Sequence, residues 1–100
     1  MQRGEVWSYT PVIPRPGISI MRLVVSADVI NDSESPWVIG LHLVDDNPNS
    51  LLAPRVGDWW AVVTTMERVM RSRLGEQMGA ATAEEMQQVD IALKACLDLY

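Results

Sequence analysis

The chain has 100 residues, of which 48% are hydrophobic and 21% charged, with a formal net charge of −5. This length holds one domain, residues 1–100, and the composition is that of a globular protein with a modest core. The acidic balance argues against a broad basic surface for nucleic acid, so a nucleic-acid site must concentrate the few cations in a local cleft. Seven of the eight cations are arginines, which favour bidentate contacts to phosphate.

The sequence predicts a cytoplasmic protein with no membrane partner. No apolar run approaches the roughly 18 residues that a membrane-spanning helix needs. Three prolines lie within residues 11–16, so the N-terminal segment lacks the apolar stretch of a secretory signal. The single cysteine, Cys96, rules out an internal disulfide and fits a reducing compartment.

The first half of the chain is predicted to form short strands joined by turns. We expect these strands at residues 5–9, 18–26 and 37–44. The proline-rich stretch 11–17 and the polar stretch 31–36 cannot continue regular structure, so they are predicted loops. Gly40 lies inside the third strand and marks an expected β-bulge.

The second half opens with a turn and continues as strands. Residues 45–50, DDNPNS, form a strong turn signal. A short strand is expected at 51–53, ended by Pro54, and a longer one at 59–66. The pair Thr64-Thr65 at the end of that strand is interpreted as β-forming or helix-capping.

The most regular pattern predicts an amphipathic helix near the C-terminus. Thr82 followed by Glu85 is a capping box, in which each side chain bonds the other's backbone N–H. Apolar side chains then recur on one helical face, at Met86, Val89, Leu93, Cys96 and Leu97. The chain is therefore predicted to be an α+β protein, a small β-barrel with a C-terminal helix packed on it.

Three motifs resemble the MazF/PemK family of toxins from bacterial toxin–antitoxin modules. The first is RGEVW at residues 3–7, a positive charge and a glycine before a strand that begins with an apolar residue and an indole. The second is the valine-rich run LVVSAD at 23–28, which ends in Ser-x-Asp and is followed by Asn31. The third is Arg73-Leu74, followed by MQQVDIAL at 86–93.

This resemblance implies an SH3-like β-barrel of the CcdB/PemK type with a C-terminal helix, assembled as a homodimer. It also implies a toxin of a type II module that cleaves single-stranded RNA at short specific sequences. The family uses no metal or other cofactor and is silenced by a cognate antitoxin protein. Four tryptophans and a high apolar content independently favour a homodimer, with the C-terminal helix or the strand of Trp59-Trp60 near the interface.

Metal-free RNA cleavage needs a base for the ribose 2′-OH, a cation for the phosphorane and an acid for the leaving oxygen. In the family, an arginine near the start of the second strand and a threonine or serine late in the third supply much of this. Arg22 lies two residues beyond that arginine position, on the same strand face, and is expected to be a surface cation whose removal leaves the fold intact. His42 falls near the threonine position and brings an imidazole, a group that can move protons. Arg22 and His42 are thus the predicted catalytic residues.

RNA contacts are predicted for five further residues, Arg15, Ser26, Arg68, Arg71 and Arg73. The candidates also have structural interpretations. Arg22 could be an ion-pair partner, His42 a residue placed incidentally between leucines, and the last three arginines a solvated turn. No metal-site spacing, glycine-rich phosphate loop or Ser-His-Asp order is present.

Two other functions stay open at the level of sequence. The first is a non-catalytic toxin or binding protein on the same fold, such as a CcdB-like poison of DNA gyrase, which the acidic charge and the displaced arginine favour. The second is a small structural or regulatory dimer without toxicity. Arg22 and His42 favour the nuclease.

Overall fold

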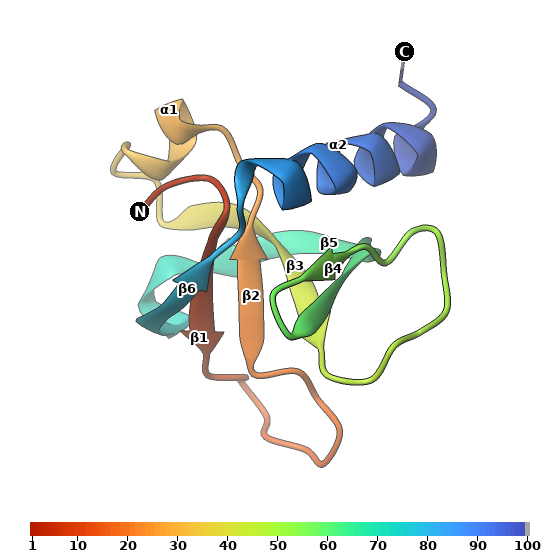
Figure 1. Ribbon diagram of the computed structural model, residues 1–100. Helices are drawn as coiled ribbons and strands as arrows, with labels where there is room; N and C mark the ends of the chain where they lie inside the picture. The colour runs from red at the N-terminus through yellow and green to blue at the C-terminus, as the bar shows by residue number, and fades with distance from the viewer. Residues whose placement is uncertain (100) are drawn as a thin grey trace.

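The computed structural model describes residues 1–99 as a bent antiparallel sheet crossed by one long helix (Figure 1). The strands are β1 (Glu5–Tyr9), β2 (Met21–Val24), β3 (Trp37–Val44), β4 (Arg55–Val56), β5 (Trp59–Met70) and β6 (Leu74–Ala80). The helices are α1 (Asp28–Asn31) and α2 (Ala83–Leu97), with a single 3-10 turn, η1 (Arg71–Arg73). Tyr100, the last residue of the expected domain, lies outside the described residues.

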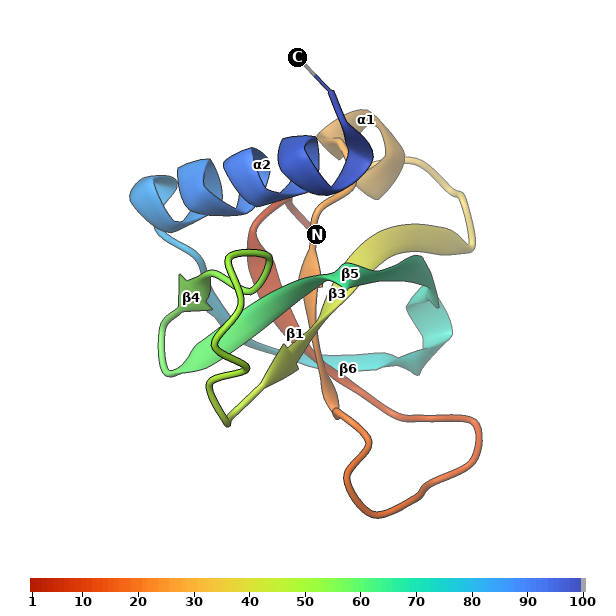
Figure 2. The ribbon, with the colours of Figure 1, turned by 90° about the vertical axis from the view of Figure 1, so that its right-hand side faces the viewer.

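The strands lie in the order β4-β5-β3-β2-β1-β6, and every neighbouring pair is antiparallel. β5 has 12 residues, long enough to pair with β4 at its start and with β3 along its length. α2 lies across the sheet at one end of the molecule, and the loop between β1 and β2 projects from the other end (Figures 1 and 2). This arrangement confirms the predicted α+β fold class with a C-terminal helix.

The main hydrophobic core lies between α2 and the sheet. Its buried members are Val6, Leu23, Val25, Leu41, Leu43, Val56, Ala61, Val63, Val89 and Ala92. Met86, Leu93 and Cys96 on the predicted apolar face of α2 pack against this core, whereas Leu97 is exposed. Each Å² of apolar surface that is buried stabilises the fold by roughly 25 cal/mol, so this layer is the principal source of stability.

Side chains on the other face of the sheet are also buried. Val24 is paired with Gly40 in the sheet, and Val38 with Val69, so these side chains point to the same side. All three valines are almost completely buried. Arg22 shares this face, because it lies two residues before Val24 on β2.

The first two motifs of the sequence contact each other in space. The Arg3 N–H donates to Asp28 Oδ1 at 2.7 Å and lowers the pKa of that carboxyl. The Gly4 N–H donates to the Val24 carbonyl, and the Arg3 guanidinium bonds both the Val25 carbonyl and Asp90 on α2. The RGEVW motif at the start of the chain therefore has a structural role, because its first two residues bond β2, α1 and α2.

The prediction of a strand over residues 18–26 is wrong at both ends. At the start, the Ser19 hydroxyl donates to the Leu43 carbonyl at 2.6 Å, which turns the backbone before Met21. At the end, the N–H groups of Val25 and Ser26 both point at the Ile39 carbonyl, so the ladder cannot continue. α1, which was not predicted, begins two residues later.

The prediction of a strand at 51–53 is also wrong, because these residues form a turn and the short strand β4 follows Pro54. The carbonyl of Pro54 accepts from the Ala61 N–H, so the proline lies beside the sheet without donating to it. β5 continues to Met70, four residues past the predicted end, and β6 was not predicted. Within residues 1–99, the structure has no helix long and apolar enough to cross a membrane.

Candidate active site

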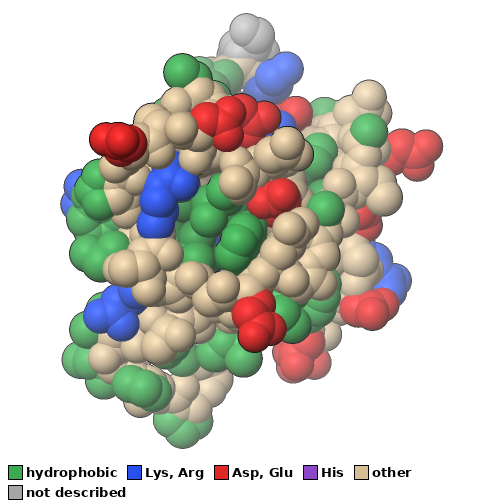
Figure 3. Space-filling view, turned by 90° about the vertical axis from the view of Figure 1, so that its left-hand side faces the viewer, with side chains coloured by type: hydrophobic (Ala, Val, Ile, Leu, Met, Phe, Trp, Pro, Cys, Tyr) green, Lys and Arg blue, Asp and Glu red, His purple; other side chains and the backbone are tan. Residues whose placement is uncertain are grey.

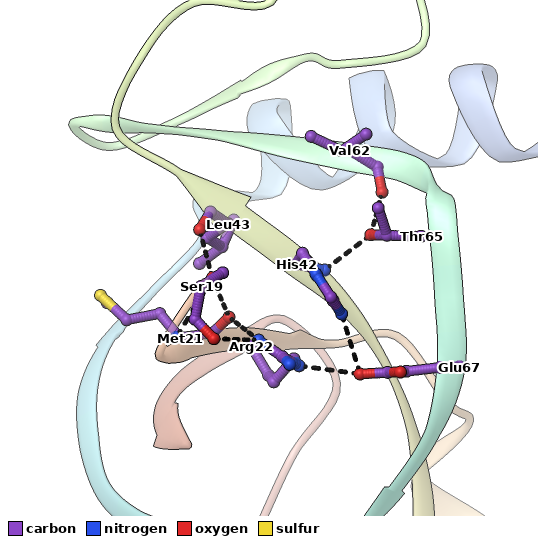
Figure 4. Close-up of polar contacts among 8 residues, drawn as sticks. All are labelled: Ser19, Met21, Arg22, His42, Leu43, Val62, Thr65 and Glu67. Carbon is purple, nitrogen blue, oxygen red and sulfur yellow. Dashed lines mark hydrogen bonds and ion pairs between the residues drawn. The ribbon is translucent and has the colours of Figure 1, made fainter. Parts of the chain in front are cut away.

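Arg22 lies at the centre of a polar cluster on the sheet face opposite α2 (Figure 4). Only 2% of the residue is exposed. Its Nη1 donates to the backbone carbonyls of Ser19 at 3.0 Å and Met21 at 2.9 Å, and its Nε donates to Glu67 Oε1 at 3.0 Å. The expectation of a surface cation is therefore wrong. Removing Arg22 would leave a cavity and would take from Glu67 one of its two side-chain partners.

One nitrogen of this arginine stays available. The Tyr9 ring covers the guanidinium, with Arg22 Cζ 3.9 Å from the ring centroid. Nη2 makes no hydrogen bond within residues 1–99. Because no fully buried side-chain nitrogen or oxygen in this part of the chain lacks a partner, Nη2 must reach solvent. Nη2 is thus an unused donor at the edge of a guanidinium that is otherwise almost completely buried.

His42 stands beside Arg22 because β2 and β3 pair these two residues directly. Its Nε2 lies 2.9 Å from Glu67 Oε1, the same oxygen that accepts from Arg22. The His42 side chain is 26% exposed, and its Nδ1 has no hydrogen-bond partner in the described chain. The structure therefore joins the two predicted catalytic residues through a carboxylate that the sequence did not single out.

A register shift between β3 and β5 shapes this site. Gly40 pairs with Glu67 but His42 pairs with Val62, so β5 carries three more residues than β3 over this stretch. The Thr65 hydroxyl spans the irregularity, accepting from the His42 N–H at 2.9 Å and donating to the Val62 carbonyl at 2.6 Å. Thr65 is thus neither a strand end nor a helix cap. The irregularity lies next to Gly40, where a bulge was expected, but its extra residues belong to β5 and Gly40 itself is paired.

Ser26, a predicted RNA contact, is buried away from this cluster. Its hydroxyl donates to Asn31 Oδ1 at 2.5 Å and accepts from the Ile39 N–H at 3.1 Å. Asn31 in turn donates to the Ser26 carbonyl. The hydroxyl of Ser26 therefore ties the end of β2 to α1 and β3.

The structure does not gather the other predicted RNA-binding arginines around Arg22. Arg71 donates to four backbone carbonyls near α1, and Arg68 lies over the Trp37 ring, with Cζ 4.6 Å from the centroid. Arg73 bonds the Thr10 carbonyl at 3.3 Å. Arg15 is exposed in the loop between β1 and β2. Arg68, Arg71 and Arg73 therefore contact different parts of the chain and do not form one basic cluster.

Four residues complete the site without having been predicted as part of it: Glu67, Tyr9, Ser19 and Thr65. Tyr9 lies two residues from Trp7 on the same strand face, and Trp7 pairs with Arg22, but only the structure gives that pairing. No local signal could have found Glu67, since its approach depends on the register shift. Within the described chain, no group of three or more His, Cys, Asp or Glu side chains could hold a metal.

An open pocket of about 360 Å³ lies near the start of β2, but on the other side of that strand. Met21, Leu43 and Trp59 are among its lining residues. Met21 and Leu43 alternate along their strands with Arg22 and His42, so they point to the opposite face. The pocket therefore opens on the other face of β2, and it adjoins the polar cluster at Ser19, which lines the pocket and whose carbonyl accepts from Arg22.

No protein-family model matches the sequence, and no curated protein sequence matches it significantly. Solved structures do match. An endoribonuclease from a mycobacterial species has a TM-score of 0.83 at 19% identity, covering 99% of this chain and 92% of its own. An endoribonuclease in complex with its cognate antitoxin, also mycobacterial, has a TM-score of 0.81 at 21% identity, covering 100% and 97%. A MazE–MazF complex from Deinococcus radiodurans has a TM-score of 0.78 at 17% identity, covering 99% and 96%.

These likenesses define the class of fold. The chain has a MazF-like fold, a curved antiparallel sheet closed by a C-terminal helix, over essentially its whole described length. The barrel of the CcdB/PemK type implied by the three sequence motifs is thereby confirmed.

Proposed function

We propose that this chain is the toxin of a type II toxin–antitoxin module and cleaves single-stranded RNA without a metal. The cluster of Arg22, Glu67 and His42 carries the proposal, because it joins a cation and an imidazole at one oxygen and leaves one nitrogen of each open. The MazF-like fold supports it, since the similar structures include endoribonucleases.

In this proposal Arg22 binds the scissile phosphate through Nη2. The Ser19 and Met21 carbonyls fix the guanidinium, so the donor needs little reorganisation as negative charge grows on the phosphorane. Tyr9 screens the other side of the guanidinium from water, which strengthens the electrostatic attraction. The buried arginine thus acts as a preformed anion site.

His42 moves the protons in the proposed reaction. The ribose 2′-oxygen attacks phosphorus while its proton passes to His42 Nδ1. The bond between phosphorus and the 5′-oxygen breaks, and that oxygen takes the proton back from the imidazolium. The products are a 2′,3′-cyclic phosphate and a 5′-hydroxyl, and the histidine is regenerated without water or any other co-reactant.

The same proposal assigns RNA contacts outside the reacting centre. Arg15 has the strongest support, because it is exposed and its loop follows β1, which carries Tyr9. Arg68 and Arg73 lie at the surface and can reach phosphates. Arg71 and Ser26 have their polar groups committed to the protein, so their contribution is to shape the surface.

The proposal includes a cytoplasmic homodimer and a cognate antitoxin. Hydrophobic side chains gather at the lower end and along one edge of the face that carries β1 and β6 (Figure 3). Such surface favours association. Two similar structures are complexes with an antitoxin or with MazE, which supports a protein partner whose acidic groups would meet Arg15 and Arg22.

RNA cleavage by the purified protein tests this function. The wild-type protein should cut single-stranded RNA in the presence of EDTA and leave a cyclic phosphate. His42→Ala should lower kcat by about 10²- to 10⁴-fold. Arg22→Lys should cost on the order of 10²-fold or more, because a point charge cannot keep the two backbone anchors and the phosphate contact together.

Arg55→Lys is the matched control, since Arg55 is an exposed arginine on β4 outside the cluster. It should cleave like the wild type. Circular dichroism must show that each variant is folded. A wild-type protein that cuts no RNA, or a His42→Ala variant with full activity, would refute the proposed chemistry.

A non-catalytic toxin is the second candidate, and one observation favours it. Arg22 is almost fully buried, and Glu67 already compensates its charge. A non-catalytic toxin would arrest growth when expressed, and the purified protein would leave RNA intact. Co-expression of the neighbouring gene product should relieve the arrest under either reading.

A further inference from the structure

We infer that Glu67 is a positioning residue that sets the reactive state of His42 and the orientation of Arg22. This inference rests on the proposed function, because it assigns a task within the same site. Its basis is a single oxygen: Glu67 Oε1 lies 3.0 Å from Arg22 Nε and 2.9 Å from His42 Nε2 (Figure 4).

The carboxylate determines which imidazole nitrogen can accept a proton. Arg22 can only donate, so Oε1 is an acceptor in that contact. An acceptor oxygen facing His42 Nε2 requires that Nε2 carry the ring proton of the neutral imidazole. The lone pair is then on Nδ1, the nitrogen without a partner in the described chain. Glu67 therefore makes Nδ1 the base.

The carboxylate also separates two positive charges. When Nδ1 accepts a proton, the imidazolium forms close to the Arg22 guanidinium. Without an anion between them, the two cations would repel each other in a partly buried site. Glu67 contacts both, so its negative charge favours the proton transfer as well as the placement of the arginine.

Gly40 gives Glu67 access to the other two residues. β3 lies between β5 and β2, so the carboxylate must reach across it. Glu67 is paired with Gly40, and the missing side chain leaves that path open. A Cβ at position 40 would lie 3.6 Å from Arg22 Cβ. The Glu67 side chain remains 41% exposed, so this is not an ion pair sealed within the core.

A double-mutant cycle tests whether Glu67 acts through His42. Glu67→Gln keeps the size and an acceptor oxygen but removes the charge. We expect kcat for RNA cleavage to fall on the order of 10²-fold with KM nearly unchanged. In a His42→Ala background the same change should cost clearly less than in the wild type, because only the orientation of Arg22 is then still affected.

Two variants keep this test interpretable. Glu67→Asp retains the charge that compensates Arg22, so it should fold, but its shorter side chain should not hold both partners and kcat should fall as well. Glu34→Gln removes an exposed glutamate from the loop before β3 and should leave kcat and KM unchanged. Thermal melting of each variant separates a loss of fold from a loss of positioning.

NMR of the unliganded protein gives a readout that does not need cleavage. Glu67→Gln should shift both the Arg22 Nε–H signal and the His42 ring nitrogens, and Glu34→Gln should shift neither. An unchanged His42 ring would overturn the inference whether or not the protein cuts RNA. If the wild type cuts no RNA but the shifts are observed, the proposed function fails while the positioning of His42 by Glu67 stands.

The kinetic outcomes are equally decisive. A Glu67→Gln variant as active as the wild type would overturn the inference. The inference would also be overturned if Glu67→Gln lowered kcat as much in the His42→Ala background as in the wild type, since Glu67 would then act independently of His42. A lower KM with a higher kcat would mean that Glu67 competes with phosphate for Arg22, which also contradicts a positioning role.

Discussion

At the residue scale, five of the seven arginines of this chain donate to backbone carbonyls. Arg71 donates to four carbonyls, those of Ile30, Asn31, Ser33 and Ser35. These carbonyls belong to the end of α1 and the turn after it, where a short helix leaves acceptors without intrahelical donors. One guanidinium therefore organises a loop that has little apolar packing of its own.

Arg71→Lys should lower the free energy of unfolding by about 2 kcal/mol, because an ammonium cannot serve four acceptors at once. Urea denaturation measures this loss. Arg68→Lys is the matched control, since Arg68 only stacks on Trp37 and such an exposed contact contributes about 1 kcal/mol or less. Equal losses in the two variants would contradict the role given to Arg71.

Gly40→Ala should destabilise the protein by about 1–3 kcal/mol and reduce RNA cleavage. Its new Cβ would lie 3.0 Å from Val69 Cγ2 and 3.3 Å from the Leu23 carbonyl, and 3.6 Å from Arg22 Cβ in the site. Gly79→Ala is the control, because nothing lies within 4 Å of a Cβ there. Unfolding curves and cleavage rates for the two variants should differ clearly, and similar behaviour would refute the packing argument.

At the element scale, α2 is held by its first turn as well as by its apolar face. The Thr82 side chain accepts from the Glu85 N–H at 3.1 Å, and the Glu85 carboxylate accepts from the Thr82 N–H at 2.8 Å. The same carboxylate accepts from the Gly57 N–H at 2.6 Å. The capping box therefore also fastens α2 to the turn between β4 and β5.

Thr82→Ala should cost about 1 kcal/mol of unfolding free energy, the usual loss for an N-cap without a side-chain acceptor. Thr82→Ser keeps the hydroxyl and should recover most of it. Chemical denaturation of the three proteins gives the comparison. A serine variant as unstable as the alanine variant would show that packing of the threonine methyl, and not capping, was lost.

The contacts of Glu85 make part of this stability dependent on pH. The Thr82 N–H is the main reason that the pKa of Glu85 lies below its ordinary value of 4.5; Gly57 adds to the effect and burial opposes it. The folded protein thus binds this proton more weakly than the unfolded chain does. The stabilisation is present above the unfolded-state pKa and is lost as the pH falls through the folded-state value.

The unfolding free energies of the wild type and Glu85→Gln should therefore differ at neutral pH and converge as the pH falls below 4.5. Denaturation measured across that range tests this. Glu84→Gln removes one charge from the same turn and controls for the general effect of charge. A constant difference between the wild type and Glu85→Gln at every pH would contradict the assignment.

At the scale of the whole molecule, exposed apolar surface favours a second copy. Ile91 and Leu97 on α2 are exposed, as is Met78 on β6. Trp59 packs against the core, so its indole offers less free surface than the sequence suggested. Of the two interface positions expected from the sequence, the C-terminal helix is therefore better supported.

The protein should sediment as a symmetric dimer at micromolar concentration. With α2 at the interface, Ile91→Lys should yield monomers, because a charge would be buried against the partner. Val29→Lys, at a more exposed position on α1, should leave the dimer intact. A monomeric wild type would refute the assembly, and a dimeric Ile91→Lys variant would move the interface elsewhere.

Local patterns in the sequence predicted α2 and its cap and the positions of β1 and β3. Each depends on contacts between neighbours in the chain or on simple alternation. β6 was not predicted, because Gly75 and Gly79 weaken the strand pattern. Its pairing with β1 stabilises an extended conformation that these residues do not favour by themselves. The start of β2 near Ser19 and the start of β4 after Pro54 were mispredicted, because they depend on hydrogen bonds to other strands.

The sequence by itself determined a run of short strands followed by a C-terminal helix and placed Arg22 and His42 on consecutive strands, because strand alternation and helix capping are local. Only the tertiary structure decided that Arg22 is buried, that Arg71 serves the backbone, and that Glu67 joins Arg22 to His42. Those outcomes depend on a three-residue register shift between β3 and β5. Such a shift arises from the packing of the whole sheet, which no stretch of neighbouring residues encodes.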